Sequence, residues 1–324
     1  MKKNDRIFDG AFAGHMNGFI KQKRALGYSY DEGAYILSNF ERFCKQHFPG
    51  AIALNREVGL KWAERRENET GTCQLNRISV LREFGKYMNS IGIPAYVIPP
   101  NIHRKSERPQ PYIYSEEELS SLFRASDEFP YSPTTPIFHL VVSVMFRLIY
   151  CCGLRPVEAR LLRTDDVDLK TGQIKILEAK RRKDRIVVMA DDMLMLARKY
   201  DEQVALQHPG RPHFFYNRFS GGVYSNVHMQ KTFRKLLDAA EIKKIAPKSP
   251  RPYDLRHTFA THRLYQWLRE GEDIETCLAY LSEYMGHSHL SDTAYYIHLV
   301  PEFFPQMAEL GFQTRAEILP EVPV

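Results

Sequence analysis

The stretch Tyr-Asp-Leu-Arg-His-Thr-Phe-Ala-Thr (253–261) is the part of this chain that most restricts the set of folds it could adopt. Leu255 and Phe259 lie four positions apart, which is the spacing of one face of a helix, so Tyr253 falls at the start of that helix. Arg256 then lies in the first turn, where backbone N–H groups point outward and an anion is favoured. The stretch therefore predicts a helix N-terminus that carries an arginine suited to an anion.

A second motif, Gly-Leu-Arg-Pro-Val-Glu (153–158), lies about a hundred residues upstream and follows an apolar run. Gly153 suits the end of a helix and Pro156 suits the first turn of the next. Arg155 is then expected at a junction between two helices, close to another anion-favouring N-terminus. By itself the motif also fits a surface arginine that is paired with Glu158.

A third motif follows the 253–261 stretch. A helix predicted over 274–284 ends at Gly286, with His287 just beyond, and the next predicted helix carries the adjacent Tyr295 and Tyr296. Taken alone, a histidine after a helix end is usually exposed and paired tyrosines usually pack. Two arginines, a histidine and a tyrosine in this order are nevertheless the groups that phosphoryl transfer to a tyrosine needs. Three other polar residues of the central stretch are expected to make structural hydrogen bonds rather than to act in catalysis: His257, Thr258 and Thr261.

Length and composition set the class of protein. The chain has 324 residues, more than the ~250–300 at which single cores stop growing, so two domains are expected. Hydrophobic residues make up 44%, enough to bury a core, which argues against a disordered chain. The net charge of +6 permits nucleic-acid binding without showing it. Seven basic residues lie between 170 and 185, and alone they fit either a solvated hairpin or a nucleic-acid surface.

The cysteines and the apolar segments bear on the compartment. Five cysteines without a Cys-x-x-Cys or disulfide-framework spacing predict buried free thiols in a reducing cytoplasm. The N-terminus lacks the apolar core of a signal peptide. The most apolar run, 137–154, is shorter than the ~20 residues of a membrane span and is interrupted by His139 and Arg147. We therefore expect a buried helix there and no membrane contact.

The chain is expected to be mostly α-helical, with a small antiparallel β-sheet in its second half. Four helical segments in the first hundred residues predict a small bundle, at 12–26, 34–48, 60–66 and 73–90. A proline-rich, charged stretch after them predicts a linker. Ser115, followed three residues later by Glu118, resembles a capping box that opens the second domain. Short β-prone runs between 164 and 189 predict the sheet. The expected organisation is an N-terminal domain over 1–105, a linker over 106–113 and a second domain over 114–324.

Together the motifs resemble those of the tyrosine recombinases, which include phage and transposon integrases and chromosome-dimer resolvases. The resemblance rests on Gly-Leu-Arg-x-x-Glu, then Arg-His-Thr-Phe-Ala-Thr-His, then Gly-His-Ser-x-x-x-x-Thr-x-x-Tyr-x-His, in that order. It covers roughly 113–300 strongly, and over 1–105 it is limited to the helical bundle and the linker. It implies an N-terminal helical core-type DNA-binding domain and a catalytic domain of mixed helices and strands.

The resemblance also implies roles for individual residues. Arg155 and Arg256 would bind the scissile phosphate, His287 would add a donor, and Tyr296 would attack phosphorus to give a 3′-phosphotyrosine and a free 5′-hydroxyl. Lys180 on the basic hairpin would protonate the departing oxygen. Neither a metal nor any other cofactor is implied.

Three positions stay open at this point. Lys183 is the alternative to Lys180, and Tyr295 is the alternative to its neighbour Tyr296 as nucleophile. Tyr253 stands where the family often has a histidine, three residues before the second arginine. A phenol with a pKa near ~10 is a poor base, although it can donate a hydrogen bond to a phosphate. The group that takes the proton from the nucleophile is therefore not identified.

The implied partner is double-stranded DNA, held by both domains, with four protomers assembled on two DNA sites. An apolar C-terminal tail after the tyrosine would dock on a neighbouring protomer or pack on its own domain. A type IB topoisomerase and a catalytically silent DNA-binding protein are the competing interpretations. The candidate phosphate contacts are Lys21, Lys23, Arg24, Arg104, Lys105, Arg108, Arg181, Arg182, Lys183, Lys243, Lys244, Lys248 and Arg251.

Overall fold

The computed structural model describes residues 7–100, 102, 110–177, 184–242 and 249–299. The chain divides into two compact units, residues 1–109 and 110–324, and the division falls inside the segment 106–113 that was expected as a linker. Of the described helices, none is both long and apolar enough to cross a membrane.

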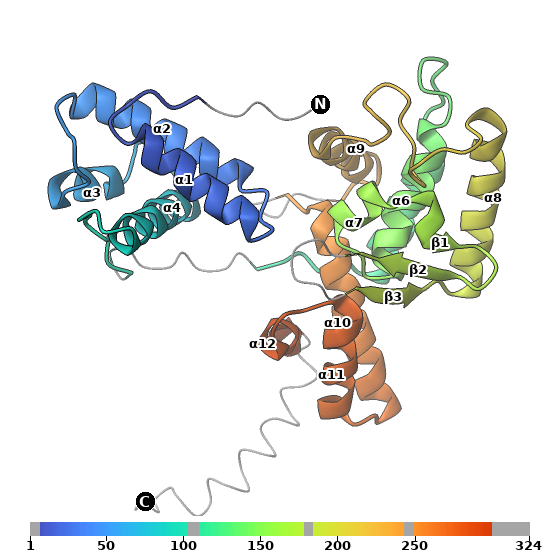
Figure 1. Ribbon diagram of the computed structural model, residues 1–324. Helices are drawn as coiled ribbons and strands as arrows, with labels where there is room; N and C mark the ends of the chain where they lie inside the picture. Colours follow the sequence, from blue (N-terminus) through green and yellow to red (C-terminus); the bar gives the residue numbers. More distant parts are fainter. Residues whose placement is uncertain (1–6, 101, 103–109, 178–183, 243–248, 300–324) are drawn as a thin grey trace, which may run out of the picture. The chain divides into compact units, whose positions relative to one another are not determined.

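The first unit is built from helices around an aromatic core. Trp62 lies between Phe40 and Phe43 at centroid distances of 5.1 and 5.2 Å, and Phe19 packs on Phe84 at 5.7 Å. These side chains come from different helices, so their burial holds the helices together. The helices of this unit, coloured blue to teal in Figure 1, are α1 (Ala13–Ala25), α2 (Asp31–His47), α3 (Arg56–Ala63) and α4 (Gly71–Ser90).

Three helices of this unit begin earlier than the sequence predicts. Helix α2 begins at Asp31 instead of residue 34 without a side-chain cap, whereas the other two begin next to such a cap. The helix expected to begin at residue 60 begins at Arg56, where the Asn55 side chain accepts a hydrogen bond from the backbone N–H of Val58 at 2.9 Å. The helix expected from residue 73 begins at Gly71, where the Thr70 hydroxyl accepts from the backbone N–H of Cys73.

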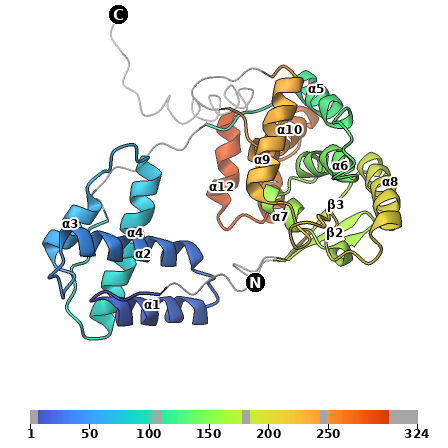
Figure 2. The same ribbon diagram turned by 90° about the horizontal axis from the view of Figure 1, so that it is seen from above.

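The second unit is organised around the buried helix α6 (Phe138–Cys151), which is apolar on nearly every side. Helices α5, α8 and α10 pack against it, and Figure 2 shows α5 beside α6 and α9. The capping box predicted at Ser115 and Glu118 is confirmed at the start of α5. The helical elements of this unit besides α6 are α5 (Glu116–Asp127), α7 (Pro156–Leu161), η1 (Thr164–Asp166), α8 (Asp191–Gln207), α9 (Asn226–Ala239), α10 (Pro252–Glu270), α11 (Ile274–Met285), α12 (Leu290–Ala294) and η2 (Tyr295–Leu299).

A three-stranded antiparallel sheet completes this unit and confirms the predicted fold class. Its order is β1 (Val167–Asp168), β2 (Gln173–Ile176) and β3 (Arg185–Val188), and Gln173 pairs with Val188 while Ile176 pairs with Arg185. Buried and exposed residues alternate along β2 and β3, so one face of the hairpin joins the core. Figure 1 shows the last strand, β3, near the helices α10 and α11, and β3 contacts α11.

The cysteines are all free, as expected, but they are not all buried. Cys44, Cys152 and Cys277 are buried, Cys151 is half-buried and Cys73 is exposed. The expectation of buried thiols is wrong for Cys73 because it lies in the first turn of α4, on the side that faces away from the core.

Candidate active site

Arg256 lies at the centre of the site, and its side chain is fully buried. It is the fifth residue of α10, which begins at Pro252, one residue before the predicted start at Tyr253, so Arg256 lies just past the first turn in which it was expected. Its Nη1 donates to the carbonyl of Gly153 at 2.6 Å and its Nη2 donates to the carbonyl of Met285 at 2.6 Å. Its Nε is buried and has no hydrogen-bond partner within the part of the chain that the structure describes. The guanidinium is thus fixed by carbonyls that follow α6 and end α11, while its Nε–H is left unpaired among the described residues.

Burial lowers the pKa of Arg256 to about 10, opposed in part by the neighbouring Tyr253, so the group stays cationic at neutral pH. A cation without a carboxylate partner of its own, with an unsatisfied N–H, is suited to an anionic oxygen.

Arg155 reaches the same segment from the start of α7. Its Nη2 donates to the carbonyl of Gly286 at 2.6 Å, and its Nη1 donates to Glu158 at 2.7 Å. The pairing with Glu158 that the sequence allowed is therefore present, but Arg155 is no isolated surface residue. It lies next to the segment that holds Arg256, because the two arginines bind consecutive carbonyls, those of Met285 and Gly286.

Arg185 is a member of this cluster that the sequence did not single out. It opens β3, its two terminal nitrogens donate to Glu158 at 3.0 and 2.7 Å, and its Nε donates to the carbonyl of Tyr284 at 2.9 Å. Burial would raise the pKa of Glu158, but the bonds and charge of Arg185 outweigh it and hold that pKa below its usual value. The only signal in the sequence was an arginine directly before an apolar strand. Several other basic residues precede it, so nothing distinguished Arg185 from them.

Three arginines therefore bind the end of one helix. The carbonyls of Tyr284, Met285 and Gly286 accept, in order, from Arg185, Arg256 and Arg155. The last carbonyls of a helix lack partners within it and carry partial negative charge, so guanidinium groups are favoured there. Helix α11 ends as predicted, with Gly286 in the left-handed conformation at φ +65°.

His287 follows this turn, and both of its ring nitrogens are engaged. Nε2 lies 3.1 Å from Nη2 of Arg256, and Nδ1 lies 2.6 Å from the hydroxyl of Thr293. A guanidinium only donates, so Nε2 accepts and the ring proton is on Nδ1, which donates to Thr293. Burial, aided by Arg256 and Arg155, lowers the pKa of His287 to about 4, which agrees with a neutral ring.

Tyr296 is buried beside these groups, with 2% of its surface exposed. Its ring is nearly parallel to that of His287, at an angle of 20° and a centroid distance of 6.2 Å. Burial raises the pKa of its hydroxyl, and the charge of Arg256 opposes that shift. Tyr295 is only half-buried. The single helix expected to carry both tyrosines is wrong, because α12 ends at Ala294 and continues as the tighter 3₁₀ turn η2.

His257 contacts the hydroxyl of Tyr296. The sequence predicted only a structural hydrogen bond for His257 and did not predict this partner. Its Nδ1 lies 3.0 Å from the Tyr296 oxygen. Tyr253, in the slot where the family often has histidine, is 38% exposed, and its ring lies 5.0 Å from that of His257. The signal in the sequence was the spacing of four residues, which puts 253 and 257 on one helix face. Thr258 does make a structural bond, because its hydroxyl donates to the carbonyl of Asp254. The same expectation is wrong for Thr261, whose buried hydroxyl has no hydrogen-bond partner among the described residues.

The remaining predicted contacts lie elsewhere or outside the described residues. Lys21 is exposed on α1, Lys23 lies 3.8 Å from Glu83, and Arg24 lies 3.7 Å from Asp31. Arg251 caps α10 by binding Asp254 at 2.9 Å. Those that fall outside the described residues are Arg104, Lys105, Arg108, Lys180, Arg181, Arg182, Lys183, Lys243, Lys244 and Lys248.

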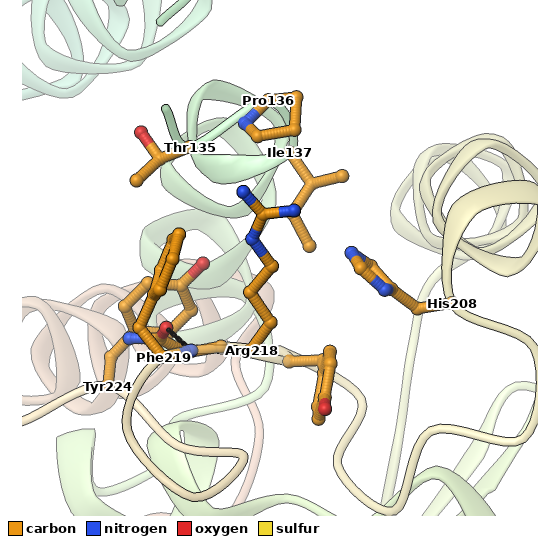
Figure 3. Close-up of a pocket in the computed structure, with 9 residues that line it drawn as sticks. Thr135, Pro136, Ile137, His208, Arg218, Phe219 and Tyr224 are labelled. Carbon is orange, nitrogen blue, oxygen red and sulfur yellow. Dashed lines mark hydrogen bonds between the residues drawn. The ribbon is translucent and has the colours of Figure 1, made fainter. Parts of the chain in front are cut away.

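Away from this cluster, a hollow of about 20 Å³ lies between the loop before α6 and the loop before α9 (Figure 3). Its lining includes Ile137, His208 and Arg218, whose guanidinium lies 4.5 Å from the centre of the Phe219 ring. This volume holds about one water molecule, too little for a substrate. Within the described ranges, no group of three or more His, Cys, Asp or Glu side chains is arranged to hold a metal ion.

Chemically, the cluster combines three guanidinium groups, two neutral imidazoles and a buried phenol. Arginines can bind the two non-bridging oxygens of a phosphodiester and stabilise the charge that grows in its transition state. A phenol at hydrogen-bond distance from a neutral imidazole can lose its proton as it attacks. The arrangement therefore suits transfer of a phosphoryl group to tyrosine.

Comparison with known proteins gives a consistent result. The model of the phage integrase family matches residues 114–302, more than half of the chain. A protein of Sinorhizobium fredii named "Putative integrase/recombinase y4rE" is 30% identical over 91% of this chain and 94% of its own length. A tyrosine recombinase of Thermosipho africanus is 28% identical over 82% of this chain and 83% of its own length. In fold, the chain resembles a crystal structure of the XerH site-specific recombinase bound to its difH substrate, with a TM-score of 0.64 and 17% identity over 85% of this chain and 77% of that chain.

Proposed function

The chain belongs to the phage integrase family and is a site-specific tyrosine recombinase, and from this premise we propose how its own residues carry out the reaction. The observation that carries the proposal is the convergence of Arg155, Arg256 and His287 on one helix end beside the buried Tyr296. A type IB topoisomerase would use the same chemistry, but the family match and the relatives favour recombination. A catalytically silent protein would not need a phenol buried against an imidazole.

In the proposed reaction, Arg155 and Arg256 bind the non-bridging oxygens of the scissile phosphate. The Tyr296 oxygen attacks phosphorus, which gives a covalent 3′-phosphotyrosine and releases a 5′-hydroxyl. The energy of the broken bond is kept in the phosphotyrosine, so rejoining needs no ATP. Lys180 is proposed as the acid for the departing 5′ oxygen, with Lys183 as the alternative. Neither lysine is among the described residues.

The second arginine and the nucleophile are both buried. Arg256 has no exposed surface and Tyr296 has 2%, so neither group meets solvent. A phosphate can reach Arg256 only when the side chains that cover it move. We therefore propose that DNA binding moves the side chains that cover Arg256 and the Tyr296 oxygen before cleavage, a step that can limit the rate.

The wider setting of the reaction is also a proposal. The relative from Sinorhizobium fredii is named an integrase/recombinase, which supports a role in integration, and we propose that the integrated DNA belongs to a mobile element. Exchange of four strands requires four nucleophiles, so we propose four protomers on two double-stranded DNA sites. Five free cysteines agree with a cytoplasmic enzyme.

The covalent step is tested with a nicked suicide DNA substrate that traps the phosphotyrosine. We expect the unmodified protein to form an adduct that denaturing gels resolve, and Tyr296→Phe to form none, because phenylalanine has no attacking oxygen. Tyr295→Phe is the matched control and should still form the adduct. An adduct that survives in Tyr296→Phe and disappears in Tyr295→Phe would move the nucleophile by one residue and refute the assignment.

A further inference from the structure

We propose that His257 is the proton acceptor for Tyr296 in strand cleavage and returns the proton to the tyrosine oxygen in rejoining. The proposal rests on the proposed function, in which Tyr296 is the nucleophile. It assigns the position that the motifs left open, because Tyr253 stands where the family often has a histidine.

The contact between the two side chains carries this inference. Nδ1 of His257 lies 3.0 Å from the oxygen of Tyr296, within the 2.6–3.2 Å expected of a general base. The phenol is the donor when Nδ1 is unprotonated and the ring proton is on Nε2. Tyr296 is buried and His257 is half-buried, so little water competes for this proton.

The other groups near Tyr296 are less suited to take the proton. Nε2 of His287 accepts from Arg256 and its Nδ1 donates to Thr293, so neither nitrogen has a free lone pair for the phenol. Tyr253 is itself a phenol and is a poor base. Tyr253 lies one helical turn before His257 on the same face of α10, and the two rings are 5.0 Å apart. The imidazole of His257 can therefore take the place of the histidine that the family often has at position 253.

The groups that face His257 set its proton affinity. The rings of Tyr253 and Tyr296 lie against it, at centroid distances of 5.0 and 5.6 Å. Burial lowers the pKa of His257 to about 4, Asp254 opposes this shift, and the charges of Arg251 and Arg256 add to it. The imidazole is therefore neutral, and able to accept, at any pH near 7.

Proton transfer to so weak a base is unfavourable while Tyr296 is a free phenol. It becomes favourable as the oxygen binds phosphorus, because an aryl ester oxygen has almost no affinity for the proton. The bound phosphate is also an anion, and a nearby anion raises the pKa of an imidazole. We therefore expect transfer and attack to occur in one step.

Atoms and charges balance in this step. As the oxygen of Tyr296 bonds to phosphorus, its proton moves to Nδ1 of His257, and the bond between phosphorus and the 5′ oxygen breaks. The 5′ oxygen takes a proton from the general acid. In rejoining, the 5′-hydroxyl returns its proton to the same acid–base group as it attacks the phosphotyrosine, and the departing phenolic oxygen takes the proton back from His257.

The test measures single-turnover adduct formation by the full chain on the suicide substrate. In His257→Asn the side chain can still bond the phenol but cannot take its proton, and we expect cleavage to slow by roughly 10²–10⁴-fold. In His257→Ala, free imidazole should restore the rate in proportion to its unprotonated concentration. The matched control is His262→Asn, since His262 lies on the same helix with its Nδ1 3.1 Å from the hydroxyl of Tyr150, and its rate should be unchanged.

The possible outcomes separate this inference from the proposed function. If the unmodified protein forms no adduct, or Tyr296→Phe does form one, the proposed function is wrong. If the unmodified protein cleaves and His257→Asn cleaves at the same rate, the proton acceptor is wrong and the nucleophile stands. Slow cleavage in both variants without rescue by imidazole, in folded protein with an unchanged melting temperature, means that His257 only positions the tyrosine, which also overturns the inference.

Discussion

Replacing Glu158 with glutamine should destabilise the second unit by removing one carboxylate that serves two arginines. Oε2 accepts from the backbone N–H of Arg155 at 2.8 Å and from Nη2 of Arg185 at 2.7 Å. Oε1 accepts from Nη1 of Arg155 at 2.7 Å and from Nη1 of Arg185 at 3.0 Å. In Glu158→Gln an amide nitrogen replaces one oxygen, so a donor faces two donors and the negative charge is lost.

The size of the effect follows from burial. The side chains of Arg185 and Glu158 are 6% and 9% exposed, and breaking such a pair from one side costs about 3–5 kcal/mol. Arg155 is 23% exposed, so water can replace part of the interaction that Arg155 loses with Glu158. We therefore expect the lower end, about 3 kcal/mol. For a unit of about 200 residues this lowers the melting temperature by roughly 6–12 °C.

The assay is differential scanning calorimetry of the full chain, combined with adduct formation on suicide DNA. Cleavage should fall as well, because Glu158 holds Arg155 beside the carbonyl of Gly286. Glu202→Gln, an exposed change of the same kind on α8, is the control and should leave both measurements unchanged. A Glu158→Gln protein that melts within about 2 °C of the unmodified chain would show that this cluster does not stabilise the unit.

Two further predictions concern the same unit. Gly153→Ala places a methyl carbon 2.5 Å from the Phe259 ring at φ +59°, whereas Gly210→Ala meets no atom within 4 Å at φ +68°. Both substitutions strain the backbone, but only Gly153→Ala adds a clash. Chemical denaturation should therefore show that Gly153→Ala is less stable than Gly210→Ala by at least about 1 kcal/mol. Equal losses of stability in the two variants would contradict the clash. Burial lowers the pKa of His257 and His287 to about 4, below the ~6.5 of unfolded histidine, so the unfolded state binds protons first. Stability should therefore be full above pH 6.5 and fall as pH drops towards 4, and His257→Asn should weaken that dependence in melts at several pH values.

Much of the second unit could be predicted because its signals are local. The capping box at Ser115, the start of α10, the left-handed Gly286 and the short antiparallel strands each depend on residues within a few positions. The same local reasoning missed the cap of Asn55, which begins α3 four residues earlier than apolar periodicity alone suggests. Caps act through one side chain, and a periodic pattern does not record them.

The site was less predictable where it depends on distant parts of the chain. The motifs identified Arg155, Arg256 and His287 as a set, and the structure brings them together. Arg185 was missed because its importance comes from Glu158, 27 residues away, and from the carbonyl of Tyr284, 99 residues away. Such partners are set by tertiary packing and leave no periodicity or short motif.

The end of helix α11 gives these separate motifs a common physical cause. Three consecutive carbonyls, of Tyr284, Met285 and Gly286, hold three guanidinium groups that come from β3, α10 and α7. Like charges brought together repel, so the cluster needs the partial negative charge of the helix end and the carboxylate of Glu158 to persist without DNA. In the proposed reaction, a phosphate that binds here adds negative charge, so its binding would relieve repulsion as well as form hydrogen bonds. The same helix end thus brings the three arginines together and leaves the cluster with a net positive charge that favours an anion.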